Sequence, residues 1–169
     1  MSSAFTVIPV PAPTFSVASP EVAVPVRPSP AFTPVISPTL PVIVKGILTV
    51  EDAKSAIKCG ADAIWISNHG GRMFNSGISS IEALIELKKK IKSKKFKIIV
   101  DGGVRRGSDI IKYLSLGADF VGIGRPAMYG LICGGHKGVE KIFEILKSEL
   151  KTAMINGGFK NLTSFKKNR

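Results

Sequence analysis

Cysteine is scarce in this chain, which has only Cys59 and Cys133 among 169 residues. Two cysteines cannot build the disulfide framework of a small secreted protein, and the sequence contains no Cys-x-x-Cys pair or Cys/His cluster that would indicate zinc. We therefore expect no metal and two reduced thiols that are buried or half-buried. The alternative of a reactive Cys133, three residues before His136, is the weaker one.

Long apolar runs are also missing, so no stretch is expected to span a bilayer. The N-terminal segment lacks the basic region and the uninterrupted apolar run of a secretory signal. Its single arginine, Arg27, is too few for a mitochondrial presequence. These absences predict a cytoplasmic protein without a membrane span.

Acidic residues are few, 12 against 24 Lys and Arg, which gives a formal net charge of +12. This charge raises the possibility of nucleic-acid binding. We favour a solvated helix end, because the densest cluster follows an apolar helical pattern, lacks interleaved aromatic residues and suits the helix dipole. The cluster comprises Lys88, Lys89, Lys90, Lys92, Lys94, Lys95 and Lys97.

Proline and glycine divide the chain into two parts. Ten of the eleven prolines lie within the first 41 residues, whereas every glycine lies after Lys45. We interpret residues 1–40 as an extended, polyproline-like or disordered proline-rich tail. Residues 41–169 have the apolar content and patterning of one folded unit.

Within this second part, apolar runs alternate with amphipathic segments. The expected strands are 41–44, 63–67, 97–100 and 119–123, and the expected helices are 50–59, 80–92, 108–116 and 139–155. Thr49 and either Ser79 or Ser80 are suitable N-caps. Four such βα units predict an α/β fold with a parallel sheet.

Each predicted strand ends in glycine or polar residues, and the carboxyl ends of parallel strands share one edge. Either an open doubly wound sheet or part of a barrel would bring these ends together. The segments 101–107 (DGGVRRG) and 122–126 (GIGRP) follow the last two strands. That order suits the phosphate cradle of a TIM barrel, in which glycines expose backbone N–H groups and arginines supply charge.

The segment after the second strand combines a base with an anion clamp. Residues 67–72 read Ser-Asn-His-Gly-Gly-Arg. The imidazole of His69 can take a proton near neutral pH, and the guanidinium of Arg72 can hold a carboxylate with two hydrogen bonds. This pair predicts a site that deprotonates a hydroxy acid and binds its carboxylate.

Together, the ordered motifs resemble the C-terminal half of the FMN-dependent α-hydroxy-acid oxidase and dehydrogenase family, which includes glycolate oxidase, lactate oxidase and flavocytochrome b2. The matching segments are 44–46 (VKG), 61–63 (ADA), 67–72 (SNHGGR), 81–84 (IEAL), 101–107 (DGGVRRG), 124–126 (GRP), 129–131 (YGL) and 134–135 (GG). The resemblance covers the chain from Pro41 to about Leu150.

The resemblance implies strands five to eight of a TIM (β/α)8 barrel that binds FMN. It makes His69 the catalytic base, and His69 with Arg72 the substrate-binding residues. The ammonium of Lys45 would lie beside the flavin N1/O2 edge. The implied cofactor-binding residues are Lys45, Ser67, Asp101, Gly102, Gly103, Val104, Arg105, Gly124 and Arg125.

The implied function is FMN-dependent oxidation of a small L-2-hydroxy acid, similar to glycolate or lactate, to the 2-keto acid. Two departures from the family pattern stand out. A glutamine normally follows soon after the motif arginine, whereas this chain continues Met73-Phe74-Asn75. The family's N-terminal half, with strands one to four, has no counterpart here, so the chain is expected to be inactive alone unless its barrel is completed.

Three outcomes stay open from the sequence. A second copy or a complementary half-barrel partner closes the barrel, the chain is a non-catalytic FMN- or phosphate-binding or assembly module, or it is a truncated remnant. Among enzymes, the rival is another phosphate-binding barrel such as the inosine-monophosphate dehydrogenase group. The 67–72 segment and the absence of that group's catalytic cysteine loop argue against it.

Overall fold

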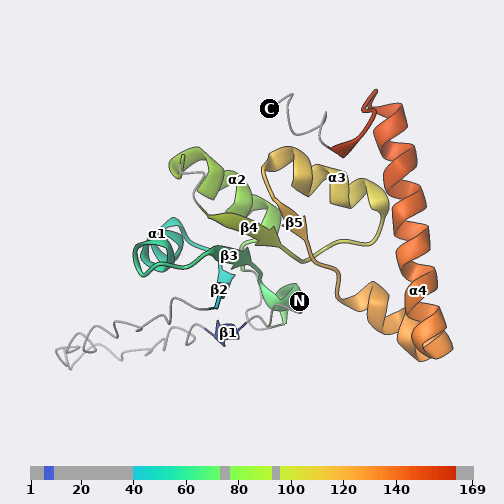
Figure 1. The fold of residues 1–169 in the computed structure, drawn as a ribbon, viewed down its shortest axis with the longest axis horizontal. Coiled ribbons are helices and arrows are strands. Elements are labelled where there is room, and N and C mark those ends of the chain that lie inside the picture. Colours follow the sequence, from blue (N-terminus) through green and yellow to red (C-terminus); the bar gives the residue numbers. More distant parts are fainter. Residues whose placement is uncertain (1–5, 10–39, 73–76, 93–95, 163–169) are drawn as a thin grey trace, which may run out of the picture.

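The computed structural model describes residues 6–9, 40–72, 77–92 and 96–162. Five strands form one sheet, in which every neighbouring pair is parallel and the spatial order follows the chain (Figure 1). The strands are β1 (Thr6–Pro9), β2 (Val42–Ile47), β3 (Ala63–Ile66), β4 (Lys97–Val100) and β5 (Phe120–Val121). The described strands show no reversal of order, which a doubly wound sheet has at its switch point. The parallel α/β prediction is confirmed.

β1 lies in the segment for which the sequence predicts an extended or disordered tail. Thr6–Pro9 pairs in parallel with β2, from Thr6 opposite Val42 to Pro9 opposite Lys45. These four residues form an edge strand, where the sequence predicts an extended, polyproline-like or disordered segment. The physical reason is that Thr, Val and Ile favour strands, and a proline is tolerated at a sheet edge. The tail prediction for residues 1–5 and 10–39 lies outside the described residues, as do Met73, Phe74 and Asn75.

Four α-helices follow strands β2 to β5, as predicted. They are α1 (Val50–Lys58), α2 (Ser80–Lys90), α3 (Gly107–Leu116) and α4 (Arg125–Asn156). The Thr49 hydroxyl accepts a hydrogen bond from the Asp52 backbone N–H and starts α1. Ser79, rather than Ser80, caps α2 in a reciprocal capping box with Glu82.

Neighbouring helices along the chain are also neighbours in space. α1 contacts α2, α2 contacts α3, and α4 packs along α3 (Figure 1). Alternate strand residues enter the core beneath them, because successive side chains point to opposite faces of a sheet. Ile64, Ile66 and Val100 are fully buried in this core together with Leu84 and Leu87 of α2. The other face of the sheet carries Lys45, Trp65, Ile99 and Phe120, which are cross-strand partners in register.

α4 differs most from the sequence-based expectation, which places a loop up to residue 138. Helical structure begins at Arg125, since Pro126 fits the first turn, and it bends at Gly134 and Gly135. The bend folds the helix back on itself. A Cβ atom at Gly130 would lie 2.6 Å from the Gly138 carbonyl oxygen. The helical segments before and after the bend therefore approach this closely only because both residues are glycine.

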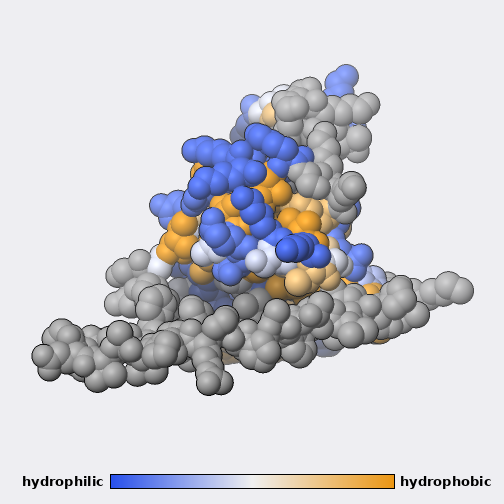
Figure 2. All heavy atoms as spheres, turned by 90° about the vertical axis from the view of Figure 1, so that its left-hand side faces the viewer, coloured by the Kyte–Doolittle hydropathy of each residue, from blue (hydrophilic) through white to orange (hydrophobic). Residues whose placement is uncertain are grey.

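Both cysteines lie on the surface of the molecule. Cys59 and Cys133 are both exposed, which contradicts the expected burial, because one caps α1 and the other precedes the bend in α4. Figure 2 shows hydrophilic groups spread over the face on the α1 side, with hydrophobic patches between them. No helix in the described ranges is both long and apolar enough to cross a membrane.

Candidate active site at the strand ends

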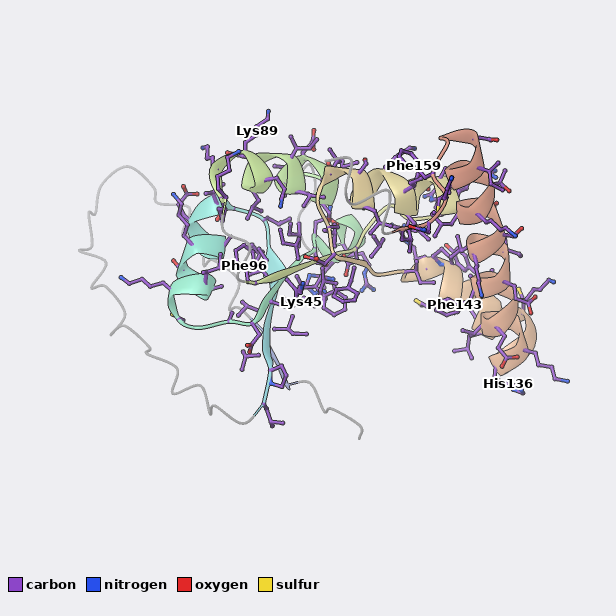
Figure 3. All side chains as sticks on the ribbon, turned by 45° about the horizontal axis from the view of Figure 1, so that its top comes forward. Lys45, Lys89, Phe96, His136, Phe143 and Phe159 are labelled. Carbon is purple, nitrogen blue, oxygen red and sulfur yellow. The ribbon has the colours of Figure 1, made fainter. Side chains whose placement is uncertain are left out.

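Three neighbouring strands deliver polar side chains to one point. Lys45 lies near the end of β2, Ser67 follows β3 and Asp101 follows β4. The Lys45 ammonium donates a hydrogen bond to Ser67 Oγ over 3.0 Å, and its Nζ lies 3.6 Å from Asp101 Oδ2. Figure 3 shows Lys45 at the centre of the molecule, where the strands end. The convergence follows from the parallel sheet, because all its carboxyl ends face one side.

Trp65 completes the surroundings of this lysine. The two residues are direct partners in the pairing of β2 with β3, and Lys45 Nζ lies 5.1 Å from the centroid of the indole ring. An aromatic face attracts a cation at this range. The ammonium is therefore held by a hydroxyl, a carboxylate and a ring.

The turn after β3 presents His69 in a conformation that is rare for its residue type. His69 has φ of 54°, the one positive value among non-glycine residues in the described ranges. Ser67 Oγ accepts the His69 N–H at 3.2 Å, and Asn68 Oδ1 accepts the Gly70 N–H at 3.0 Å. Such a backbone costs free energy and persists where surrounding bonds impose it. The turn thus holds the imidazole out at the exposed edge of the site.

Arg72 closes the same turn. Its Nε donates to the His69 carbonyl oxygen at 3.3 Å, and the side chain is exposed. The guanidinium has further N–H groups for an anion. His69 and Arg72 are thereby joined into one unit, with the base and the cation three residues apart.

The turn after β4 contains the predicted segment from Asp101 to Arg105. Gly102 and Gly103 both have positive φ, 100° and 69°, so this backbone needs glycine. The Tyr113 hydroxyl donates to the Gly102 carbonyl oxygen at 2.7 Å and fixes the turn to α3. The Val104 side chain is buried in the core, which leaves only its backbone for a ligand, and Arg105 is exposed.

Arg125 links the last predicted segment to the first. It follows Gly124 at the start of α4, and its Nη2 donates to the Gly70 carbonyl oxygen at 3.3 Å. The bond spans 55 positions along the chain. The N-terminus of α4 and the guanidinium together offer positive charge to an anion.

A hollow of about 360 Å³ lies between these turns. Its lining includes Asn68, Gly70, Gly71, Gly102, Gly103 and Arg125. A larger depression, about 530 Å³, runs along one face of α4 and contains none of the strand-end residues, so we assign no part of the site to it. His136 lies at the bend of α4, well away from Lys45 (Figure 3).

Two groups near the Gly102 turn have shifted pKa values. Burial, followed by the negative charges of Asp101 and Asp109, raises the pKa of the Tyr113 phenol. For Asp109, partial burial acts to raise the pKa, but hydrogen bonds from the Arg105 backbone, Lys112 and the Arg106 backbone outweigh it, so the pKa is lowered. Tyr113 therefore stays a hydroxyl donor, and Asp109 stays an acceptor, across neutral pH.

The structure thus brings Lys45, Ser67 and Asp101 into contact, joins His69 to Arg72, and joins Arg125 to the His69 turn. Among the described residues, the Arg105 guanidinium makes no hydrogen bond or ion pair. Sequence reasoning missed three residues that shape the site, namely Trp65, Asn68 and Tyr113. The alternation of β3 places Trp65 on the face of Lys45, and an Asn before a glycine turn is a known Asx signal, so two of the three were detectable.

The fold defines an α/β protein with a parallel sheet, whose strand ends carry Lys45, Ser67 and Asp101. A sequence profile of the FMN-dependent dehydrogenase family matches residues 37–169, and the chain belongs to this family. The family indicates FMN as the cofactor.

Individual relatives give the same picture. The chain is 50% identical over 127 residues to L-lactate oxidase of Lentilactobacillus hilgardii, covering 75% of this chain and 34% of that protein. It is 43% identical over 129 residues to human 2-hydroxyacid oxidase 2, covering 76% and 36%. A crystal structure of mandelate oxidase with benzoyl-formic acid superposes with a TM-score of 0.71 at 41% identity, covering 76% and 38%. The chain thus spans about a third of the length of the curated relatives it matches.

Proposed function

We propose that residues 41–169 form one unit, equivalent to strands five to eight of a (β/α)8 barrel, which binds FMN and oxidises a small L-2-hydroxy acid to the 2-keto acid. The observation that carries this proposal is the contact of Lys45 with Ser67 and Asp101 beside the His69–Arg72 turn. A cation, a base and a carboxylate clamp at one sheet edge are the groups that such an oxidation needs.

The donor set fits FMN. Gly102, Gly103 and Gly124 keep backbone near the site free of side chains, and a Cβ added at Gly103 or Gly124 would meet nothing within 4 Å. Arg125 at the start of α4 would hold the phosphate, with Arg105 as a second cation. The ammonium of Lys45 would lie at the edge of the flavin ring that becomes negative on reduction.

The substrate would bind through Arg72. Its guanidinium would pair with the carboxylate of the hydroxy acid through two parallel hydrogen bonds. A ring nitrogen of His69 would take the proton of the substrate hydroxyl, a task that suits imidazole near neutral pH. FMN, when bound, supplies the acceptor for the two electrons that leave the α-carbon. Loss of the hydroxyl proton to His69, and of the α-hydrogen with the two electrons to this acceptor, converts the alcohol into the carbonyl of the 2-keto acid.

The inner face of the sheet supports a further part of the proposal, namely a complementary half-barrel or a second copy that covers it. Trp65 and Ile99 are only half-buried there, and Phe120 is 58% exposed. Apolar residues on a sheet face of this kind normally pack against another layer. Such a partner would also exclude water from the exposed His69 and Arg72.

Anaerobic titration of the FMN-reconstituted chain with L-lactate and with glycolate tests the proposal. We expect the visible absorbance of oxidised flavin to bleach with the L-acid and not with D-lactate. His69→Ala should slow this bleaching by about a hundredfold or more, because it removes the base, while flavin remains bound. A folded sample that holds flavin but is never bleached by either acid would contradict catalysis.

The exposure of His69 and Arg72 favours one second candidate, a non-catalytic FMN- or phosphate-binding module. In that case the chain would bind FMN through Arg125 and the glycine turns without turning over a hydroxy acid. The same titration separates the two functions, since bound flavin without bleaching supports the module. A folded chain that binds no FMN would contradict both.

A further inference from the structure

Trp65 is the one tryptophan of the chain, and it lies on the central strand β3 between β2 and β4. It pairs with Lys45 of β2 on one side and with Ile99 of β4 on the other. Behind it, a Cβ atom at Gly122 would lie 3.3 Å from Cζ2 of the indole ring, so this glycine leaves the ring its space. Strands β2 and β4 and the segment that follows β5 therefore border Trp65.

The indole side chain of Trp65 makes no hydrogen bond among the described residues. Its Nε1 is buried and has no hydrogen-bond partner in the part of the chain that the structure describes. Leaving a buried donor unpaired is unfavourable, and a leucine or phenylalanine at this position would avoid that cost. The interaction that the ring does make with a polar group is with the Lys45 ammonium, 5.1 Å from its centroid.

The three partners of Lys45 act differently on its ammonium. Ser67 accepts one N–H, and Asp101 Oδ2 lies 3.6 Å away. Both attract the ammonium toward the ends of β3 and β4, which Ser67 and Asp101 follow. The indole attracts the same charge through its face and accepts no conventional hydrogen bond, so an N–H stays free for another acceptor.

We infer that Trp65 is a positioning residue, which holds the Lys45 ammonium so that its charge and a free N–H meet the flavin edge. This inference rests on the proposed function. Its consequence is that Trp65 acts on the cofactor through Lys45, and favours reduced FMN over oxidised FMN because the reduced ring carries the negative charge.

The placement of Lys45 can be tested without any cofactor. An aromatic ring close to the lysine shifts its side-chain proton resonances upfield. In the FMN-free chain, we expect upfield Lys45 CεH₂ signals in the wild type and in Trp65→Phe, and ordinary positions in Trp65→Leu. Lys45→Met assigns the signals by removing them. An unchanged Lys45 signal in a folded Trp65→Leu would overturn the inference whatever FMN does.

The effect on the cofactor is measured as the ratio of the dissociation constants for oxidised and reduced FMN. We expect Trp65→Leu to lower this preference for the reduced form about fivefold, which corresponds to about 1 kcal/mol of cation–π attraction. Trp65→Phe should keep most of the preference, since an aromatic face remains. A merely structural role would instead track melting temperature and not the ratio.

A double-mutant cycle then asks whether Trp65 works through Lys45. In a Lys45→Met background, Trp65→Leu should leave the ratio unchanged. If the loss persists there, or if Phe and Leu lower the ratio equally, the inference is wrong although the proposed function stands. If the wild type binds no FMN, the proposed function fails, and the resonance shift still decides whether Trp65 holds Lys45.

Discussion

The Ser67 hydroxyl accepts a hydrogen bond from the Lys45 ammonium at 3.0 Å, although the two residues stand 22 positions apart. The same oxygen accepts the His69 backbone N–H at 3.2 Å. Ser67 is 1% exposed, so its hydroxyl oxygen meets these two donors rather than bulk water. One buried hydroxyl therefore couples the strand-end cation to the turn that carries the base.

Ser67→Ala should lower the free energy of unfolding by about 1–3 kcal/mol, because it removes the acceptor of the His69 backbone N–H and one of the two oxygen acceptors beside the Lys45 ammonium. Urea denaturation measures the change. Ser55→Ala is the matched control, since Ser55 is exposed on α1 and should shift the value by no more than about 0.5 kcal/mol. Equal effects of the two substitutions would show that the buried hydroxyl has no special part.

Gly107→Ala should separate α3 from α4. A Cβ atom at Gly107 would lie 2.1 Å from the Leu150 backbone nitrogen and 2.6 Å from the Leu146 carbonyl oxygen, and backbone cannot yield as a side chain can. We expect a loss of about 3 kcal/mol in unfolding free energy, measured by urea denaturation. Ser108→Ala, one position further in the same helix, controls for helix propensity. A Gly107→Ala protein as stable as this control would refute the close packing.

Arg125→Ala should weaken FMN binding about tenfold to a hundredfold, as expected for the loss of a charge-assisted hydrogen bond to phosphate. Riboflavin has the same ring and no phosphate, so its affinity should stay the same. Quenching of flavin fluorescence measures both. Arg106→Ala is the control, because Arg106 pairs with Glu149 and lies outside the proposed site. Equal losses for FMN and riboflavin would contradict a phosphate contact.

Asp109 should contribute an acid limit to stability. Hydrogen bonds lower its pKa in the folded chain despite partial burial, so the unfolded chain binds the proton more tightly. Its contribution is therefore present above the unfolded pKa of about 3.9 and is lost as the pH falls through the folded value. Unfolding midpoints measured from about pH 6 downward should fall less steeply for Asp109→Asn than for the wild type. Parallel curves would contradict the assignment.

Tyr113 should contribute an alkaline limit. Burial, with the charges of Asp101 and Asp109, raises its pKa above the usual value of 10.0. The stabilising contribution of the neutral phenol is present below the unfolded pKa and is lost as the pH rises through the folded one. In a Tyr129→Phe background, ultraviolet absorbance reports phenolate formation at Tyr113 alone, since the chain has two tyrosines. Ionisation at or below the usual pH would overturn the prediction.

The sequence predicted most of the secondary structure, because apolar spacing and cap residues act over a few positions. β4 has the predicted bounds, and α1 begins at Val50 behind Thr49 as expected. The prediction failed for Arg125–Gly138, where four glycines suggested a loop. Those glycines instead allow a bend and a backbone contact between Gly130 and Gly138, which only the folded chain reveals.

The site was predictable as a set of residues and not as an arrangement. Lys45, Ser67, His69, Arg72 and Asp101 stand in recognisable local motifs, each of which can be interpreted by itself. The reach of Arg125 to the Gly70 carbonyl and the position of Trp65 beneath Lys45 depend on the register of separate strands. No local pattern encodes a distance between residues that far apart.

The amino-acid sequence by itself determined the alternation of strands and helices, the glycine turns and the family to which the chain belongs. These properties follow from backbone preferences and from side-chain patterns within about ten residues. The tertiary structure alone decided that the Lys45 ammonium lies among Ser67, Asp101 and Trp65. That arrangement exists because parallel pairing in one register brings three strand ends together, a result of packing across the whole sheet.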